Sequence, residues 1–242
     1  MKKQDWILIL CVVIVLTPFF IPATHFLEVF ERWTGAYPFV MAFFKFAILS
    51  TLGEMIGLRI RKGVYNEKGF GIAPRMMVWG FLGMCIAFAM TVFKSGIPVV
   101  LGTIATIDPS VTRPEAIAHL REVFASSDLT WGKVGIAFCV SVSMNTIFAP
   151  VMMTFHKCTD AHILMNGGTV SGLLRKMKIG EILPKLDWDT HWNLVLKKTI
   201  PLFWFPAHTL TFLLPGTWQV LFAAFLGIAL GVILAIANNT KK

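Results

Sequence analysis

Six long apolar stretches, separated by polar segments, dominate the pattern of the chain. They are residues 6–23, 37–58, 76–93, 131–155, 199–214 and 218–237. The hydrocarbon core of a bilayer is about 30 Å thick, so a helix needs about 20 apolar residues to cross it. The stretches are continuous and do not alternate in polarity, which favours helices over the strands of a membrane barrel. The pattern therefore predicts an all-α, polytopic transmembrane helix bundle with about six spans.

The composition agrees with an environment of lipid. Of the 242 residues, 56% are hydrophobic and only 14% are charged, and the mean hydropathy is +0.70. Soluble domains carry roughly a quarter charged residues. In a soluble protein a formal charge of +9 would suggest a nucleic-acid partner. In a membrane protein an excess of basic residues is expected in the cytoplasmic loops and needs no such partner. We therefore expect one integral membrane domain over residues 1–242, with the lipid bilayer as partner, no nucleic acid and no cofactor.

The charges of the connections predict the orientation of the spans. With six spans, sixteen of the 22 Lys and Arg residues fall on one side and five on the other. Cytoplasmic loops carry the excess of basic residues, so the first side is predicted to be cytoplasmic and to hold both termini. Five or seven spans would mix the two sets. The N-terminus lacks an Arg- and Ser-rich transit peptide, which favours a bacterial inner membrane over the inner membrane of an organelle.

Two connections carry an amphipathic pattern of their own. Residues 112–125 begin with a Thr112/Glu115 capping box and continue with apolar positions at helical spacing, which predicts a short amphipathic helix on the outer surface. This helix would cover the bundle or act as a lid over an opening. Residues 157–190 interleave Leu and Met with Arg and Lys after an Asn-Gly-Gly-Thr turn, which predicts an inner amphipathic loop against the lipid headgroups.

Two ionisable residues fall inside the second apolar stretch. Charges at membrane depth are costly, so each is a functional candidate. Lys45 lies near the outer interface, where its stem could reach the headgroups. Glu54 lies deeper and shares a helix face with Ser50. Its carboxylate would either line a polar path or form a buried pair with a basic residue such as Arg59 or Arg61.

Prolines and polar side chains coincide in the fourth and fifth stretches. Asn145 precedes Pro150 in the fourth, and His208 follows Pro201 and Pro206 in the fifth. A proline cannot donate to the carbonyl four residues before it, so each of the three predicts a helix break that leaves a backbone acceptor at membrane depth. Such breaks are tolerated where protein or water satisfies the backbone. The two polar side chains therefore join the path candidates of the second stretch.

Small residues form stripes on two of the stretches. In the second and the sixth they recur every four residues and so share one helix face: Gly53, Gly57, Ala223, Gly227, Gly231 and Ala235. Such stripes let helix backbones approach closely. They predict either close packing within the bundle or contact between copies of the chain in a homo-oligomer.

One short segment contains the residue types of a metal site. His156, Cys158, Asp160 and His162 follow the fourth stretch. On a helix they divide into two i,i+4 pairs, His156 with Asp160 and Cys158 with His162. Two ligands on one face are too few for a closed tetrahedral site. We therefore predict no metal site, with His156, Cys158 and His162 as the weak candidates. No set of catalytic residues gathers at one depth, so we do not expect an enzyme.

Three fragments carry a resemblance to a known family. Gly53-Glu54 stands where the family has Gly-Asp, and residues 145–150 stand where it has Gln followed five residues on by Pro. Residues 204–215 are similar to its Trp-Pro, Asn-Phe and Val-Pro signature, whereas Gln219 departs from the expected Arg. From about Phe46 onwards the chain thus resembles the family of the Mpv-seventeen inner mitochondrial membrane protein and the twenty-two-kilodalton peroxisomal membrane protein. The resemblance implies a small membrane protein of about four spans, proposed in some members to form a weakly selective channel.

Two functions remain open at this point. Polar groups at membrane depth favour a small channel or transporter for an unidentified ion or small solute. The small-residue stripes and the amphipathic connections would also serve a non-transporting membrane scaffold or homeostasis factor that holds partners. Replacing Glu54 by Gln distinguishes these hypotheses, because the scaffold does not need the charge.

Overall fold

The computed structural model describes residues 2–105 and 110–239, without the side chains of residues 105 and 233–239. These residues form helices and no strand, which confirms the all-α class. The longer helices are α1 Lys3–Phe20, α2 Phe26–Ala36, α3 Pro38–Lys62, α4 Ile72–Ala105, α5 Arg113–Ala125, α6 Trp131–Met165, the π-helix η3 His191–Trp204, α10 Phe205–Leu213 and α11 Gly216–Asn239. The shorter ones are η1 Pro22–Thr24, α7 Val170–Leu173, α8 Ile179–Ile182, η2 Leu183–Lys185 and α9 Trp188–Thr190.

Four of the described helices are long and apolar enough to cross a membrane, namely α1, α3, α4 and α6. The other two predicted spans lie on shorter helices. Residues 199–214 fall largely on η3 and α10, which follow each other without a gap, and residues 216–232 of α11 form a shorter apolar helix. Large apolar side chains face outward, with Leu202 76% and Val151 70% exposed. A helical bundle with such an apolar surface is typical of a protein that associates with a membrane.

Two helices are longer than the apolar pattern predicted. α4 continues to Ala105 instead of ending near residue 93, and α6 continues to Met165 instead of residue 155. The last turns of α6 stay helical because their charged residues find partners inside the bundle, such as Asp160, which pairs with Arg75 at 2.7 Å. The first nine residues of the predicted inner loop, residues 157–165, are therefore helix. Residues 26–36, for which no helix was predicted, form α2.

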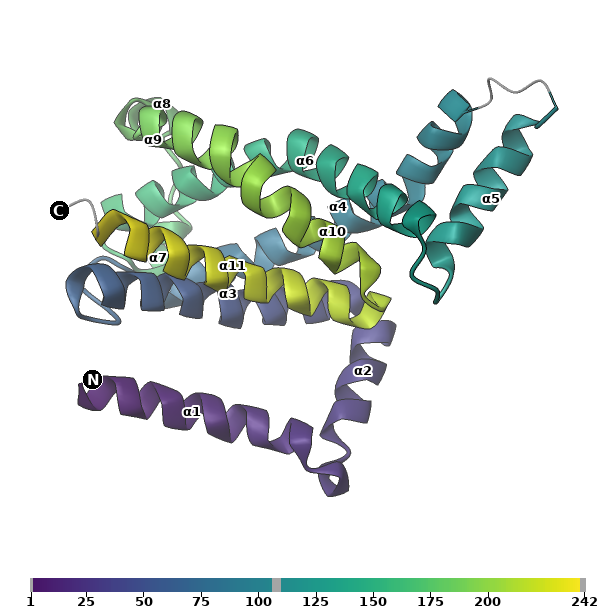
Figure 1. The fold of residues 1–242 in the computed structure, drawn as a ribbon. Helices are drawn as coiled ribbons and strands as arrows, with labels where there is room; N and C mark the ends of the chain where they lie inside the picture. The colour runs from purple at the N-terminus through teal and green to yellow at the C-terminus, as the bar shows by residue number, and fades with distance from the viewer. Residues whose placement is uncertain (1, 106–109, 240–242) are drawn as a thin grey trace.

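α5 agrees with the outer helix predicted over residues 112–125. Its capping box is present, because the backbone N–H and the hydroxyl of Thr112 donate to Glu115 Oε2 at 2.9 and 2.8 Å. These bonds hold the pKa of Glu115 below its ordinary value. α5 runs back along the end of α4 (Figure 1), and a Cβ at Gly102 would lie only 2.6 Å from Ile117 Cγ1. The outer helix α5 thus packs against the part of α4 that extends beyond the predicted span.

Beyond α6 the remainder of the predicted inner loop is a turn followed by the short helices α7 to α9. Gly167 and Gly168 have φ angles of +73° and +70°, a region that favours glycine. Gly168 also approaches the α3–α4 connection, since a Cβ there would lie 2.7 Å from the carbonyl of Gly69. This contact brings two basic connections to the same end of the bundle.

The two ends of the bundle differ, as Figure 1 shows. α1 begins, and α3 and α11 end, at one end, which we call the inner end following the predicted orientation, while α5 lies at the other, the outer end. None of the described residues of α1 is buried. The helix is joined to the inner end by Asp5, whose carboxylate accepts from Arg59 Nε and Nη2, both at 2.8 Å, and from the Tyr65 hydroxyl at 2.9 Å.

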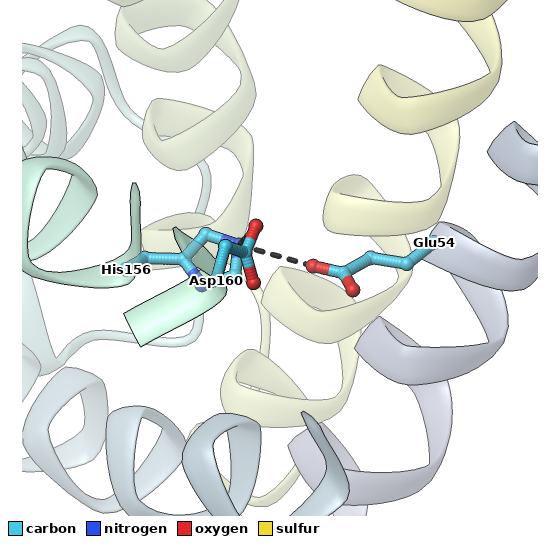
Figure 2. A group of neighbouring side chains, drawn as sticks. All are labelled: Glu54, His156 and Asp160. Carbon is cyan, nitrogen blue, oxygen red and sulfur yellow. Dashed lines mark ion pairs between the residues drawn. The ribbon is translucent and has the colours of Figure 1, made fainter. Parts of the chain in front are cut away.

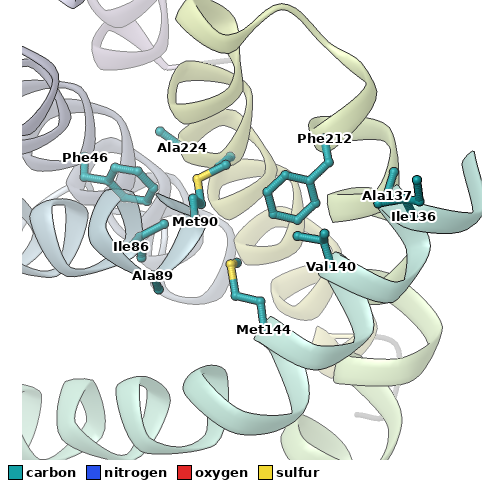
Figure 3. Close-up of a cluster of buried hydrophobic side chains, with 11 residues drawn as sticks. Phe46, Ile86, Ala89, Met90, Ile136, Ala137, Val140, Met144, Phe212 and Ala224 are labelled. Atoms are coloured by element: carbon teal, nitrogen blue, oxygen red, sulfur yellow. The ribbon is translucent and has the colours of Figure 1, made fainter. Parts of the chain in front are cut away.

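An apolar cluster fills the bundle between α3, α4, α6, α10 and α11 (Figure 3). Its members, which we call the apolar plug, are Phe46, Ile86, Ala89, Met90, Ile136, Ala137, Val140, Met144, Phe212, Ala223 and Ala224. Phe212 and Met90 are each 2% exposed. Close backbone approaches hold the surrounding helices, since a Cβ at Gly83 of α4 would lie 2.7 Å from the Ala42 carbonyl oxygen of α3.

Candidate functional site

A cavity of about 450 Å³ lies inside the bundle, lined by residues of α3, α4, α6, η3, α10 and α11 and of the α3–α4 connection. Three of the four predicted path residues line it: Glu54 from α3, Asn145 from α6 and His208 from α10. We call this space the inner cavity, because Arg61 and Lys62 at the inner end of α3 also line it. The helices therefore bring together polar residues that lie up to 154 positions apart in the sequence, as between residues 54 and 208.

Glu54 is the centre of a network between three helices (Figure 2). Its Oε1 accepts a hydrogen bond from Trp79 Nε1 at 2.9 Å and lies 3.0 Å from His156 Nε2. Its Oε2 accepts from Arg75 Nη1, which also donates to Asp160 Oδ1 at 2.7 Å. The side chains of Arg75 and Glu54 are only 12% and 19% exposed. The expectation of a buried ion pair was right, but the partner is Arg75, whereas the predicted Arg59 binds Asp5.

Helix periodicity explains how these side chains meet. Arg75 and Trp79 are four residues apart on α4, as His156 and Asp160 are on α6, so each pair presents one face to Glu54. Arg75 is held further by its own neighbour, because Nε donates to the Phe70 carbonyl at 2.8 Å and the guanidinium lies 4.5 Å from the centre of the Phe70 ring. The position of Arg75 is thus fixed by the carboxylates on one side and by Phe70 on the other.

The network contains more acid than permanent base. The carboxylates of Glu54 and Asp160 face the single guanidinium of Arg75, and His156 is the remaining group that can carry positive charge. Its Nε2 must donate to Glu54 Oε1, since an ionised carboxylate only accepts. The ring of His156 also packs on the ring of Trp79, with 4.3 Å between the centroids. A proton gained or lost by one of these side chains would therefore change the charge balance of the network.

Asn145 and His208 form a second polar contact deeper in the bundle. Asn145 Nδ2 donates to the Ser141 carbonyl at 2.8 Å and lies 3.0 Å from His208 Nδ1. The imidazole therefore accepts at Nδ1 and carries its proton on Nε2. Asn145 is 1% and His208 7% exposed, and the ring of Trp204 lies 4.9 Å from that of His208.

Several polar atoms that line the inner cavity lack a protein partner. Within the described residues, the unpartnered buried side-chain atoms include Ser50 Oγ, His156 Nδ1, His191 Nδ1 and Trp204 Nε1, all from residues that line the cavity. Unpartnered donors and acceptors are costly in a dry interior, and such a polar space is suited to water or a polar solute.

The prolines act differently from one another. Pro150 does not break α6, which runs through it, so that expectation was wrong; packing against neighbouring helices maintains the helix where one backbone bond is lost. Pro201 lies within the π-helix η3, and Pro206 lies in the first turn of α10, where the π geometry changes to α. Ser141 Oγ donates to the Phe205 carbonyl at 2.8 Å and so satisfies an acceptor at this junction.

The fourth path candidate, Lys45, does not line the inner cavity. It is 5% exposed, its Nζ donates to Thr34 Oγ1 of α2 at 2.9 Å, and it lies 4.5 Å from the centre of the Phe30 ring. Its positive charge is thus held by a hydroxyl and an aromatic face, away from the inner cavity. Lys45 joins α2 to α3, which is a structural position.

The small-residue stripes of α3 and α11 meet each other. A Cβ at Gly53 would lie 3.0 Å from Ile228 Cα, one at Gly57 would lie 3.9 Å from the Gly231 carbonyl oxygen, and one at Gly227 would lie 3.7 Å from Ser50 Oγ. Close packing within the bundle therefore accounts for these glycines. Ala223 belongs to the apolar plug, and the side chain of Ala235 lies outside the described residues.

The predicted metal candidates separate as the i,i+4 spacing indicated. Cys158 is 4% exposed, and His162 Nε2 lies 3.2 Å from the Leu173 carbonyl, away from the network. Among the described residues, one group could hold a metal ion, namely Glu54, His156 and Asp160, whose ligand atoms lie within 4.8 Å of one another. Arg75 already bonds both carboxylates, so a metal ion would have to displace a guanidinium. The geometry favours an ion-pair network over a metal site.

Sequence reasoning missed two members of the network. Arg75 stands one position before the predicted third span and Trp79 lies within that span, and neither was singled out as a candidate from the sequence. Their i,i+4 spacing, matched by His156 and Asp160, was the available signal.

The chain was also compared with known proteins. No family model, no curated protein and no solved structure matches it. The function is therefore argued from the site.

Proposed function

We propose that the protein is a small membrane channel or transporter for an ion or a small solute, and that the structure represents its closed state. The observation that carries this proposal is the inner cavity, a space within an apolar helix bundle that is lined by the polar side chains of Glu54, Asn145 and His208 among apolar ones. Ionisable and polar groups inside a membrane are costly unless they face such a space. A chain that needed only to sit in lipid would not require them.

The apolar plug supplies the barrier that a closed path requires. Phe46, Ile86 and Met144 belong to the plug and also line the inner cavity, while Phe212 lies in the plug and lines a second pocket at the outer end. The plug therefore separates polar spaces on its two sides. Apolar constrictions of this kind close a pore by excluding water.

The proposal includes six spans with both termini inside. Its supports are the excess of basic residues in one set of connections and the fact that α1 begins where α3 and α11 end (Figure 1). η3 with α10, and α11, would form the fifth and sixth spans. A bacterial inner membrane is the proposed location.

The proposal also keeps the resemblance to the Mpv-seventeen and peroxisomal membrane protein family. Glu54 and Asn145, which belong to the fragments that carry the resemblance, line one cavity. The alternative of a non-transporting scaffold is less favoured. Gly53, Gly57, Gly227 and Gly231 pack between α3 and α11 within the bundle and so do not offer a surface to partners. An enzymatic role is not proposed.

Glu54→Gln should change ion selectivity, since Gln keeps the shape of the side chain and removes one negative charge from the inner cavity. Arg75 keeps the carboxylate of Asp160 as a partner, which limits the loss of stability. We expect the ratio of chloride to potassium permeability to rise several-fold, measured from reversal potentials of the reconstituted protein in planar bilayers. The matched control is Glu67→Gln, because Glu67 also lines the cavity but pairs with Lys62 at its exposed inner end. An unchanged ratio in Glu54→Gln, or the absence of any flux through the wild-type protein, would contradict the proposal.

A further inference from the structure

A second pocket, of about 930 Å³, opens at the outer end of the bundle. It lies between α4, α5, the start of α6 and the turn between α10 and α11, which Figure 1 shows at the same end. Its lining residues include Lys94, Arg121, Ser126, Lys133 and Gln219. We call it the outer pocket. None of these residues belongs to the network around Glu54.

The charged residues that line the outer pocket are all basic. Lys94 comes from α4, Arg121 from α5 and Lys133 from α6, and no Asp or Glu is among the described residues that line the pocket. On the predicted outer side the sequence has only five basic residues, so three of the five gather here. The same side carries six acidic residues, and a chance collection would be expected to include some of them. The convergence of three helices on one sign of charge favours a negatively charged ligand.

Among the described residues, no carboxylate lies within ion-pair distance of any of the three cations. Lys94 Nζ donates to the amide oxygen of Gln219 at 2.8 Å, and Lys133 Nζ donates to the Ser126 carbonyl at 2.5 Å. Arg121 has no acidic partner within ion-pair distance among the described residues. Neutral acceptors orient the ammonium groups and leave their charge available.

The pocket is also held in place around Lys94. Gln219 is 6% exposed, and its Nε2 donates to the Leu214 carbonyl at 2.9 Å, so its oxygen is aimed at Lys94 by a second bond. Gly216, the first residue of α11, lines the same space. The positive end of the dipole of this long helix therefore adds to the charge of the side chains.

We propose that the outer pocket binds an oxyanion, a carboxylate or a phosphate, through Lys94, Arg121 and Lys133. A guanidinium fork bonds two oxygens of such a group, and the two ammonium groups supply further charged donors. Across the plug, Arg61 and Lys157 line the inner cavity without a carboxylate within ion-pair distance among the described residues. An anionic solute would thus meet basic groups on both sides, and in the inner cavity it would also meet the carboxylates of Glu54, Glu67 and Asp160. The inference that the oxyanion is the transported solute rests on the proposed function. Binding of the oxyanion to the outer pocket does not.

The test is equilibrium binding of radiolabelled inorganic phosphate and succinate to the full-length protein in phosphatidylcholine nanodiscs. We expect saturable binding that weakens as ionic strength rises. Arg121→Gln, Lys94→Gln and Lys133→Gln should each weaken it about tenfold, the effect of losing one charge-assisted hydrogen bond. Arg113→Gln is the matched control, since Arg113 is a basic residue of the same helix as Arg121 and does not line the pocket.

Further arms distinguish the sources of the anion. If phosphatidylglycerol in the nanodiscs displaces both probes, the pocket takes a lipid headgroup; the oxyanion site stands and the solute assignment is overturned. If neither probe binds saturably, or if Arg113→Gln weakens binding as much as Arg121→Gln, the site itself is overturned. If succinate binds but is not transported by protein that carries other solutes, only the assignment of the transported solute is contradicted. Binding in nanodiscs is measured separately from transport.

Discussion

Arg75→Leu is expected to destabilise the protein by about 3–5 kcal/mol, because it leaves the carboxylates of Glu54 and Asp160 together in a largely buried network without their guanidinium. Removing one partner of a buried ion pair costs more than replacing the whole pair, since the remaining charge has lost its counter-charge. Unfolding of the purified protein in detergent with increasing denaturant would measure the loss.

Two variants separate this effect from a general loss of positive charge. Arg61→Leu removes a base that lines the same cavity but has no acidic partner within ion-pair distance among the described residues, and we expect a change within about 0.5 kcal/mol. Arg75→Leu combined with Glu54→Gln and Asp160→Asn should recover most of the stability. Equal stability of Arg75→Leu and Arg61→Leu would contradict the network.

Phe212→Ser should open the path. Phe212 is 2% exposed and lies in the apolar plug between the outer pocket and the inner cavity, so a small hydroxyl side chain would admit water where an aromatic ring excluded it. We expect conductance in potassium chloride across planar bilayers to rise at least about tenfold, which corresponds to a barrier lowered by about 1.4 kcal/mol.

The controls keep this result interpretable. Phe212→Leu retains an apolar side chain and should stay closed, which also shows whether a change at this position is tolerated by the fold. Phe88→Ser alters a phenylalanine of α4 that is 61% exposed on the outside of the bundle and should not conduct. Conductance that rises equally in Phe88→Ser would assign the leak to a disturbed bundle and not to the plug.

The path candidates could be predicted from the sequence because the free-energy cost of placing a polar side chain at membrane depth can be estimated without knowing its neighbours. Glu54, Asn145 and His208 were found in this way, and all three line the inner cavity. The same reasoning included Lys45, which is instead held by Thr34 and Phe30. A residue's depth in the membrane can be estimated from its position in an apolar stretch, but the side of the helix that faces a cavity depends on its neighbours.

The rest of the site depends on how helices far apart in the sequence are aligned. The partner of Glu54 is Arg75 because α3 and α4 pack closely along each other, as where Gly83 approaches Ala42, and hydropathy does not encode that alignment. The extended end of α6 is explained by the same contacts, since Asp160 and His156 would be loop residues by charge alone. The outer pocket likewise combines bases that were counted separately in the sequence.

The central claim, a polar path inside a lipid-facing bundle, is tested most directly by two cysteines on one helix. Met153 lines the inner cavity, whereas Val151, two residues earlier on α6, is 70% exposed on the outside and does not. In a variant whose Cys11, Cys85, Cys139 and Cys158 are replaced by Ser, each position is changed to Cys. Vesicles that expose the inner end of the bundle are then treated with a charged, membrane-impermeant thiol reagent. A path filled with water predicts that Met153→Cys is labelled and that Val151→Cys, which faces lipid, is not. Labelling of Val151→Cys with protection of Met153→Cys would contradict the account.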